Sequence, residues 1–213
     1  MQFTRLIAIR HGETAWNVDT RIQGQLDIPL NATGRWQAQR VARALAARDP
    51  IHAIYTSDLA RARETAQAVS DATGAPLTTD EGLRERGFGT FQGQTFAEIE
   101  ARLPEEALRW RKRDPHWAPE GGESLTQMRA RVQETLNTLA ARHPGEQVVL
   151  VAQGGVLALL YRAATGLDLQ APRTWQLGNA AVNRLLWTPE GLTLVGWSDT
   201  SHLDEETLDE TST

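Results

Sequence analysis

Three short apolar runs stand out along the chain, and each is followed first by polar or glycine residues and then by a helical pattern. The runs are residues 6–9, 51–55 and 148–151. Short apolar runs that are bounded by turn signals are typical of buried strands. The pattern therefore predicts strands that alternate with helices.

Four segments carry apolar residues at helical spacing. The first helix is expected to begin near Thr33, whose hydroxyl can cap it, and the second runs from Asp58 as N-cap to a stop signal at Gly74. The third is expected to begin at Ser124, and the fourth follows Gly155.

The last apolar segments form a different pattern. Residues 184–187 and 192–197 flank a Thr-Pro-Glu-Gly turn, which predicts a hairpin that closes one part of the sheet. Together, the elements predict an α/β fold, a three-layer sandwich with helices on both faces of a mostly parallel central sheet. Ligands of such folds bind at the carboxyl ends of the strands, so the residues after the three apolar runs should share one cleft.

Composition narrows the class of protein. The chain has 213 residues, a net charge of -5, 40% hydrophobic residues and no cysteine. These values favour a single domain over residues 1–213 and exclude disulfides and cysteine-bound zinc. No run is apolar enough for a membrane span and no secretory leader is recognisable, so we expect a cytoplasmic protein without a membrane partner. The acidic balance argues against a nucleic-acid partner, although a local basic pocket is compatible with it.

Three residues after the predicted strands suit phosphoryl chemistry. Arg10 and His11 follow the first apolar run, and Arg61 lies in the first turn of the second helix. Paired guanidiniums match phosphate oxygens, and their charge disfavours a protonated imidazole between them. His11 would then be a neutral nucleophile that carries the phosphoryl group. In the alternative interpretation, Arg10 is a surface residue and His11 a turn histidine, because a short Arg-His-Gly match is weak by itself.

The wider context of these residues is more specific than the short match. The accompanying motifs are LIAIRHGET at 6–14, WN at 16–17, RIQG at 21–24, DIPL at 27–30, TG at 33–34, SDLARA at 57–62, ETA at 64–66, LRE at 83–85, GES at 122–124 and Asn179. With this series the chain resembles the histidine phosphatase superfamily, also called the phosphoglycerate mutase-like family. The resemblance implies a three-layer α/β fold, a phosphohistidine on His11, phosphate binding by Arg10 and Arg61, and Glu85 as the proton donor to the leaving oxygen.

Further polar residues are candidates for the same site. Expelling an alkoxide requires a proton, which a carboxylic acid at Glu85 can supply. Alternatively, Glu85 pairs with a neighbouring arginine on a solvated loop. Asn17, Gln23 and Gly24 are candidates for phosphate or substrate contacts through amide and backbone N–H groups, or are simple turn residues.

The sequence departs from the family pattern after the third apolar run. Where the family has a second catalytic histidine in a Ser/Ala-His-Gly pattern, this chain has Gln153. A glutamine amide can donate to a phosphoryl oxygen but cannot become cationic, so we expect weakened turnover. Three explanations stay open: a substitution made by design to trap a ligand, a naturally weakened enzyme, and a noncatalytic binder.

Two segments lie outside the predicted alternation of strands and helices. A basic and aromatic stretch at residues 109–117 falls in a variable cap segment at about residues 100–123. It is either a solvated helix face with tryptophan anchors or a cover that contacts the nonphosphate part of an anionic substrate. The tail after His202 is acidic and is expected to be solvated or loosely docked.

The sequence therefore predicts a metal-independent phosphatase that hydrolyses a small phosphorylated metabolite through a phosphohistidine. Alternatives are a phosphoglycerate mutase-type phosphotransferase and a noncatalytic module that binds a phosphorylated ligand. The chain contains no Walker loop, dinucleotide fingerprint or metal-ligand cluster, so we expect neither a cofactor nor a metal ion. The expected partner is a small phosphomonoester, and the assembly that the sequence leaves open is a homodimer.

Overall fold

The central feature of the computed structural model, which describes residues 2–204, is one six-stranded sheet. Its strands lie in the order β3-β2-β4-β1-β5-β6, and the first four of these are parallel, whereas β5 and β6 run antiparallel to their neighbours. The strand bounds are β1 Thr4–Arg10, β2 Ala53–Thr56, β3 Leu77–Thr79, β4 Gln147–Ala152, β5 Val182–Thr188 and β6 Gly191–Asp199. The three strands predicted from the apolar runs are thus confirmed, as is the hairpin of β5 and β6.

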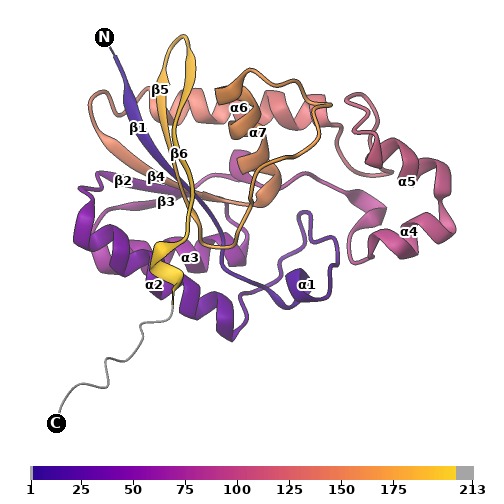
Figure 1. Ribbon diagram of the computed structural model, residues 1–213, viewed down its shortest axis with the longest axis horizontal. Coiled ribbons are helices and arrows are strands. Elements are labelled where there is room, and N and C mark those ends of the chain that lie inside the picture. The colour runs from indigo at the N-terminus through magenta and orange to yellow at the C-terminus, as the bar shows by residue number, and fades with distance from the viewer. Residues whose placement is uncertain (1, 205–213) are drawn as a thin grey trace.

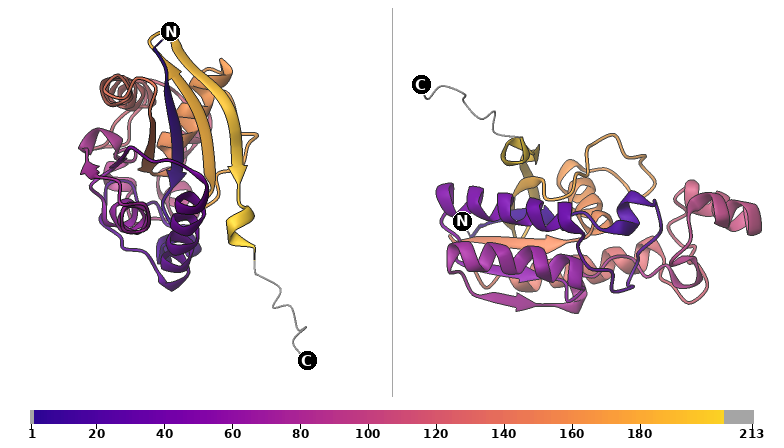
Figure 2. Two further views of the ribbon diagram at one scale, coloured as in Figure 1. Left: turned by 90° about the vertical axis from the view of Figure 1, so that its left-hand side faces the viewer. Right: turned by 90° about the horizontal axis from the view of Figure 1, so that it is seen from below.

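Alternating side chains along the central strands build two separate cores. Leu6 and Ala8 of β1 pack into one apolar cluster, and Ile7 and Ile9 pack into another on the opposite face. The first cluster is covered by α6 (Leu125–Ala140) and α7 (Gly154–Thr165), and the second by α2 (Ala32–Arg48) and α3 (Ala60–Thr73). Figure 1 shows the two helix pairs on either side of the sheet, and the view from below in Figure 2 shows α2 and α3 side by side. The prediction of a three-layer α/β sandwich is confirmed.

Two predicted helix caps are wrong, for reasons that lie in tertiary structure. Asn31, not Thr33, caps α2, and its Oδ1 accepts a hydrogen bond from the Gly34 N–H at 2.8 Å. Helix α3 begins at Ala60, because Asp58 is held by an ion pair with Arg84.

The other two predicted helix starts agree with the structure. Ser124 caps α6 through a reciprocal pair of hydrogen bonds with Gln127. Helix α7 begins at Gly154, one residue before Gly155, with Gln153 as its N-cap residue.

Residues 94–123, called the cap here, extend from one end of the sandwich. The cap contains α4 (Phe96–Arg102) and α5 (Pro104–Arg111), which lie far from the sheet in Figure 1. A separate apolar cluster joins the cap to neighbouring loops. Ile99, Ala107 and Trp117 of the cap pack with Phe91, and further contacts come from Ile22, Phe88, Phe96 and Trp110. The segment of about residues 100–123 that the sequence singles out thus contains α5 and the end of α4.

The remaining elements are short. They are α1 (Ala15–Val18) and the 3₁₀ turns Glu81–Leu83, Gly89–Phe91 and Ser201–Leu203. None of the helices in the described part of the chain is both long and apolar enough to cross a membrane. The acidic tail that the sequence analysis singled out lies, from residue 205 onward, outside the described residues.

Candidate active site

The carboxyl ends of β1, β2 and β4 bring the three predicted segments together. The backbone N–H of His11 donates to the carbonyl of Ala152 at 3.0 Å, and that of Ser57 donates to Val151 at 3.1 Å. The segments after the strands therefore start side by side, as expected at this edge of a parallel sheet.

His11 is a buried histidine with one of its ring nitrogens fixed as a donor. The side chain is 2% exposed, and Nδ1 lies 2.6 Å from the carbonyl oxygen of Gly12. Because a carbonyl can only accept, Nδ1 carries the hydrogen and Nε2 of the neutral ring keeps its lone pair. Burial, reinforced by the positive charges of Arg10 and Arg61, holds the pKa of His11 well below 6.5. The imidazole is thus neutral at physiological pH.

Two arginines flank this histidine, and backbone carbonyls orient both. The Arg61 guanidinium donates to the carbonyls of Gly24 at 2.6 Å and Leu26 at 2.7 Å, and Arg10 donates to the carbonyl of Leu177. Their buried Nε atoms have no hydrogen-bond partner among the described residues. Burial lowers the pKa of Arg61 to about 10, which leaves the guanidinium charged near neutrality. Both side chains keep donors available for an anion.

His11, Arg10 and Arg61 line a cavity of about 200 Å³, which is called the inner cavity here. Its lining residues are Arg10, His11, Asn17, Arg21, Ile22, Gln23, Gly24, Arg61, Glu85, Phe88, Trp110 and Gly154. Seven of the eight predicted site residues are therefore at one cavity.

The predicted amide contacts line the same wall. Oδ1 of Asn17 accepts from the Thr14 N–H at 3.0 Å, and Oε1 of Gln23 accepts from the Thr14 hydroxyl at 2.8 Å. Since the amide oxygens bind Thr14, the NH₂ groups are the ends available to a phosphoryl oxygen. Gly24 has a φ of +53°, and a Cβ there would lie 2.4 Å from the side chain of Gln92. The positive φ and the close approach of Gln92 both favour glycine at this turn.

Glu85 lies in the cleft rather than in an ion pair. Its Oε1 accepts from the backbone N–H of Arg86 at 2.7 Å, and its Oε2 accepts from the backbone N–H of Gly155 at 3.0 Å. Arg84 is paired with Asp58 instead. The Arg86 guanidinium donates to two backbone carbonyls of the cap. The structure therefore disagrees with the alternative in which Glu85 forms a solvated pair with its neighbours.

Gln153 is buried beside the site but does not line the inner cavity. The side chain is 1% exposed, and Nε2 donates to the hydroxyl of Ser57 at 2.7 Å. The buried Oε1 has no hydrogen-bond partner among the described residues. A rotation of the amide by half a turn would let Ser57 donate to Oε1 and would free both amide hydrogens. The residue can therefore act as a neutral donor.

A second cavity, called the outer cavity here, adjoins the inner one and was not predicted. It has a volume of about 330 Å³ and shares with the inner cavity the lining residues Arg10, Glu85, Phe88, Trp110 and Gly154. Its remaining lining residues are Arg86, Arg113, Leu125, Met128, Gly155, Ala158, Leu159, Arg162, Arg173 and Leu177. Of the basic residues of the cap, Arg113 is the one that reaches this cavity. The basic run 109–113 was the available signal, but it gave no hint of Arg162 and Arg173.

Within residues 2–204, no group of three or more His, Asp and Glu side chains is placed to hold a metal ion.

A neutral histidine flanked by Arg10 and the buried Arg61, at the strand ends of a three-layer α/β fold, defines a phosphoryl-transfer enzyme. Residues 6–200 match the sequence profile of the Histidine phosphatase superfamily (branch 1), and the chain belongs to this superfamily.

Individual relatives agree with this assignment over nearly the whole chain. Phosphoglycerate mutase-like protein 4 of Arabidopsis thaliana is 38% identical over 209 residues, which is 96% of this chain and 89% of the relative. The metal-independent phosphoserine phosphatase of the same plant is 35% identical and covers 95% of this chain and 84% of its own. A solved structure of mycobacterial glucosyl-3-phosphoglycerate phosphatase with VO₃ superposes with a TM-score of 0.81 at 38% identity, covering 92% of this chain and 99% of that one.

Proposed function

We propose that the chain is a metal-independent phosphatase that hydrolyses a small phosphorylated metabolite through a phosphohistidine on His11. The observation that carries the proposal is the neutral Nε2 of His11 in a cavity flanked by Arg10 and Arg61. Two of the relatives described above are phosphatases for esters of this kind, which supports the substrate class.

Binding of the phosphoryl group uses the free donors of the inner cavity. Arg10 and Arg61 provide charge and fixed N–H groups, and the amides of Asn17 and Gln23 add neutral donors. Because backbone carbonyls already hold both guanidiniums, little side-chain freedom is lost on binding.

The first chemical step transfers the phosphoryl group to the protein. The lone pair of Nε2 forms a bond to phosphorus while the bond from phosphorus to the ester oxygen breaks. Glu85, in its protonated form, gives its proton to the departing oxygen, so an alcohol leaves rather than an alkoxide. Its position at the border of the two cavities supports this role.

The second step releases phosphate and restores the protein. Glu85, now a carboxylate, takes a proton from a water molecule whose oxygen attacks phosphorus as the bond from phosphorus to Nε2 breaks. Inorganic phosphate leaves, and His11 is again neutral with its hydrogen on Nδ1. Atoms, charge and protons balance over the two steps.

Gln153 is proposed to weaken this reaction. A neutral amide lacks the charge assistance that a protonated histidine gives to phosphoryl oxygens, a difference of about 1–2 kcal/mol for one hydrogen bond. Its burial against Ser57 and its absence from the inner cavity wall support a reduced contribution.

A phosphate-release assay combined with covalent labelling tests the proposal. The unmodified protein should release inorganic phosphate from a phosphomonoester and form a label that acid removes and base does not, as expected of a phosphoramidate. The His11→Ala variant should do neither. A label that persists in His11→Ala would contradict the assignment of the nucleophile.

The mutase alternative has a specific observation in its favour, the similarity to a phosphoglycerate mutase-like protein. Incubation with 3-phosphoglycerate and 2,3-bisphosphoglycerate separates the two activities. Free phosphate as the main product supports the phosphatase, whereas 2-phosphoglycerate as the main product supports the mutase.

A further inference from the structure

We propose that His202 is a positioning residue for the reaction at His11. It holds residues 177–180, called the support loop here, and this loop in turn holds Arg10, His11 and Asn17. The inference rests on the proposed function, because it assumes that these three residues bind and attack the phosphoryl group. His202 itself lines neither the inner nor the outer cavity, so it acts through the support loop.

The support loop fixes Arg10 at two points. The backbone N–H of Ala180 donates to the carbonyl of Arg10 at 2.8 Å, and the carbonyl of Leu177 accepts from the Arg10 guanidinium. The loop therefore holds both the backbone and the side chain of this arginine. Because Arg10 lines both cavities, a displacement of the loop would move a donor that binds the phosphoryl group.

Asn179 connects the support loop to two more residues of the site. Its Nδ2 donates to the backbone carbonyl of His11 at 3.0 Å and to Oδ1 of Asn17 at 3.3 Å. Oδ1 of Asn17 also accepts from the backbone N–H of Thr14. Two donors on this oxygen hold the Asn17 amide in the orientation that leaves its NH₂ group for a phosphoryl oxygen.

Ala180 is the strained point of the support loop. Its φ is +57°, and the residue is fully buried. A residue with a Cβ adopts this left-handed conformation only at a cost in free energy, so surrounding contacts must maintain it. Its N–H is bound to Arg10, and its carbonyl accepts from Nε2 of His202 at 2.8 Å. His202 therefore supplies one of the contacts that keep the loop in this conformation.

The ring of His202 has a defined role as a donor. Because a carbonyl can only accept, Nε2 carries the hydrogen of the neutral ring. Burial is the main cause that lowers the pKa of His202, so the ring is neutral near pH 7. Its buried Nδ1 has no hydrogen-bond partner among the described residues. The bond to Ala180 is thus the one hydrogen bond that this ring makes within residues 2–204.

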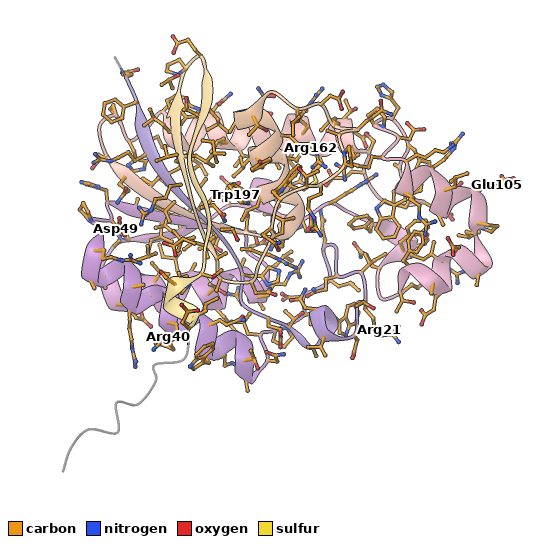
Figure 3. All side chains as sticks on the ribbon, viewed as in Figure 1. Arg21, Arg40, Asp49, Glu105, Arg162 and Trp197 are labelled. Carbon is orange, nitrogen blue, oxygen red and sulfur yellow. The ribbon has the colours of Figure 1, made fainter. Side chains whose placement is uncertain are left out.

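The 3₁₀ turn Ser201–Leu203, which carries His202, is anchored on α2 rather than on the cleft. Arg40 of α2, labelled in Figure 3, donates to the carbonyl of His202 at 2.7 Å and to that of Asp204 at 3.0 Å. Leu203 packs against the apolar cluster that α2 and α3 cover. His202 therefore connects the core on this face of the sheet to the support loop.

Two variants at position 202 separate the hydrogen bond from the bulk of the side chain. His202→Phe keeps an aromatic ring but loses the donor, whereas His202→Gln keeps an N–H at a similar distance from the backbone. We expect His202→Phe to lower kcat/KM for p-nitrophenyl phosphate by about 5- to 20-fold, and to weaken calorimetric binding of inorganic phosphate by about fivefold. His202→Gln should keep both values within about threefold of the parent.

A change at the other end of the hydrogen bond tests whether His202 acts through the support loop. Glycine adopts a positive φ at little cost, so the loop should depend less on His202 in Ala180→Gly. In this background, the further change His202→Phe should lower kcat/KM by less than about twofold. A loss of the same size in both backgrounds would show that His202 acts by another route.

Leu139→Ala is the control for a merely structural role. Leu139 is buried at the C-terminal end of α6 and lines neither cavity. Urea unfolding should show a larger loss of stability for this variant than for His202→Phe, while kcat/KM stays within about twofold of the parent. If His202→Phe fails to fold, His202→Asn takes its place, because its amide is too short to span the same distance.

Each outcome decides the inference. Values for His202→Phe within about twofold of the parent, an equal impairment in His202→Gln, or a comparable kinetic loss in Leu139→Ala would overturn it. If the unmodified protein hydrolyses no ester, but His202→Phe weakens phosphate binding and His202→Gln restores it, the positioning role stands and the proposed function fails. If the unmodified protein neither hydrolyses the ester nor binds phosphate, both fail.

Discussion

The backbone N–H of Gly155 donates to the carboxylate of Glu85 at 3.0 Å, and the same glycine leaves room for that carboxylate. A Cβ at position 155 would lie 2.1 Å from Oε1 of Glu85. The first turn of α7 thus both orients the proposed proton donor and requires glycine at the point of contact. Gln153, which directly follows β4, is the N-cap residue of the same turn.

Gly155→Ala should impair the proton donor without removing it. The added methyl group must displace the Glu85 carboxylate, so we expect kcat for alkyl phosphates to fall by about 10- to 100-fold. Hydrolysis of p-nitrophenyl phosphate should fall much less, because its leaving group needs little protonation. Steady-state kinetics on both esters measure the difference, and Gly196→Ala is a control in open space. An equal loss on the two esters would contradict the role of Glu85.

Protonation of His11 should couple the stability of the fold to pH. Burial, followed by the charges of Arg10 and Arg61, keeps the pKa of His11 in the folded state well below 6.5, whereas the pKa of a histidine in the unfolded chain is about 6.5. Between these two values the unfolded state binds more protons. The stabilisation is therefore complete above about pH 6.5 and is lost as pH falls toward the folded-state pKa.

Urea unfolding of the parent and of His11→Ala at about pH 7.5 and about pH 5 measures this contribution. The parent should lose more free energy of unfolding between the two pH values than the variant loses. His202, whose pKa burial also lowers, is present in both proteins and cancels in the comparison. Equal losses in the two proteins would show that His11 is not held neutral in the folded state.

Arg61→Lys should be costly even though it keeps the charge. The guanidinium of Arg61 spans two carbonyls and still has a free Nε, an arrangement that one ammonium group cannot reproduce. We expect kcat/KM to fall by roughly 100-fold. Arg63→Lys on the exposed face of the same helix is the control and should keep its kinetics. Unaltered kinetics in Arg61→Lys would place this residue outside the reaction.

Gln153→His should raise the rate by roughly 10- to 1000-fold, with turnover improving more than binding. The gain belongs mainly to the transition state, whose charge lies on the phosphoryl oxygens. Gln153→Leu, which removes the donor, should be slower than the parent. Rates of parent and Gln153→His that agree within about twofold would show that position 153 supplies no charge to the reaction.

The arrangement of strands and helices could be predicted because it follows from local patterns, whereas two helix caps could not. Thr33 and Asn31 are both suitable caps, and the choice falls on Asn31 because Glu13 holds its backbone and its side chain. Asp58 is drawn away from its helix by Arg84, which lies 26 positions along the chain. Contacts between distant residues override local preference at both positions.

The lining of the inner cavity could be predicted from the sequence, whereas most of the lining of the outer cavity could not. His11, Arg10 and Arg61 stand in specific motifs directly after strands, so their grouping follows from the topology of the sheet. The outer cavity takes Arg113 from the cap, Arg162 from α7 and Arg173 from the loop before β5, and Arg162 follows an apolar run that predicts only core packing. Nothing in the local sequence around these residues distinguishes them from solvated arginines.

The cap packs on an apolar cluster that is separate from the two cores of the sheet. Trp110 of the cap and the neighbouring Phe88 line both cavities while they pack against this cluster, so this part of the cavity wall belongs to neither core of the sheet. Substitutions on α4 and α5 can therefore alter which esters are accepted while the nucleophile and its arginines keep their geometry. We therefore expect that exchanging residues of this segment changes selectivity among esters more than it changes the reaction at His11.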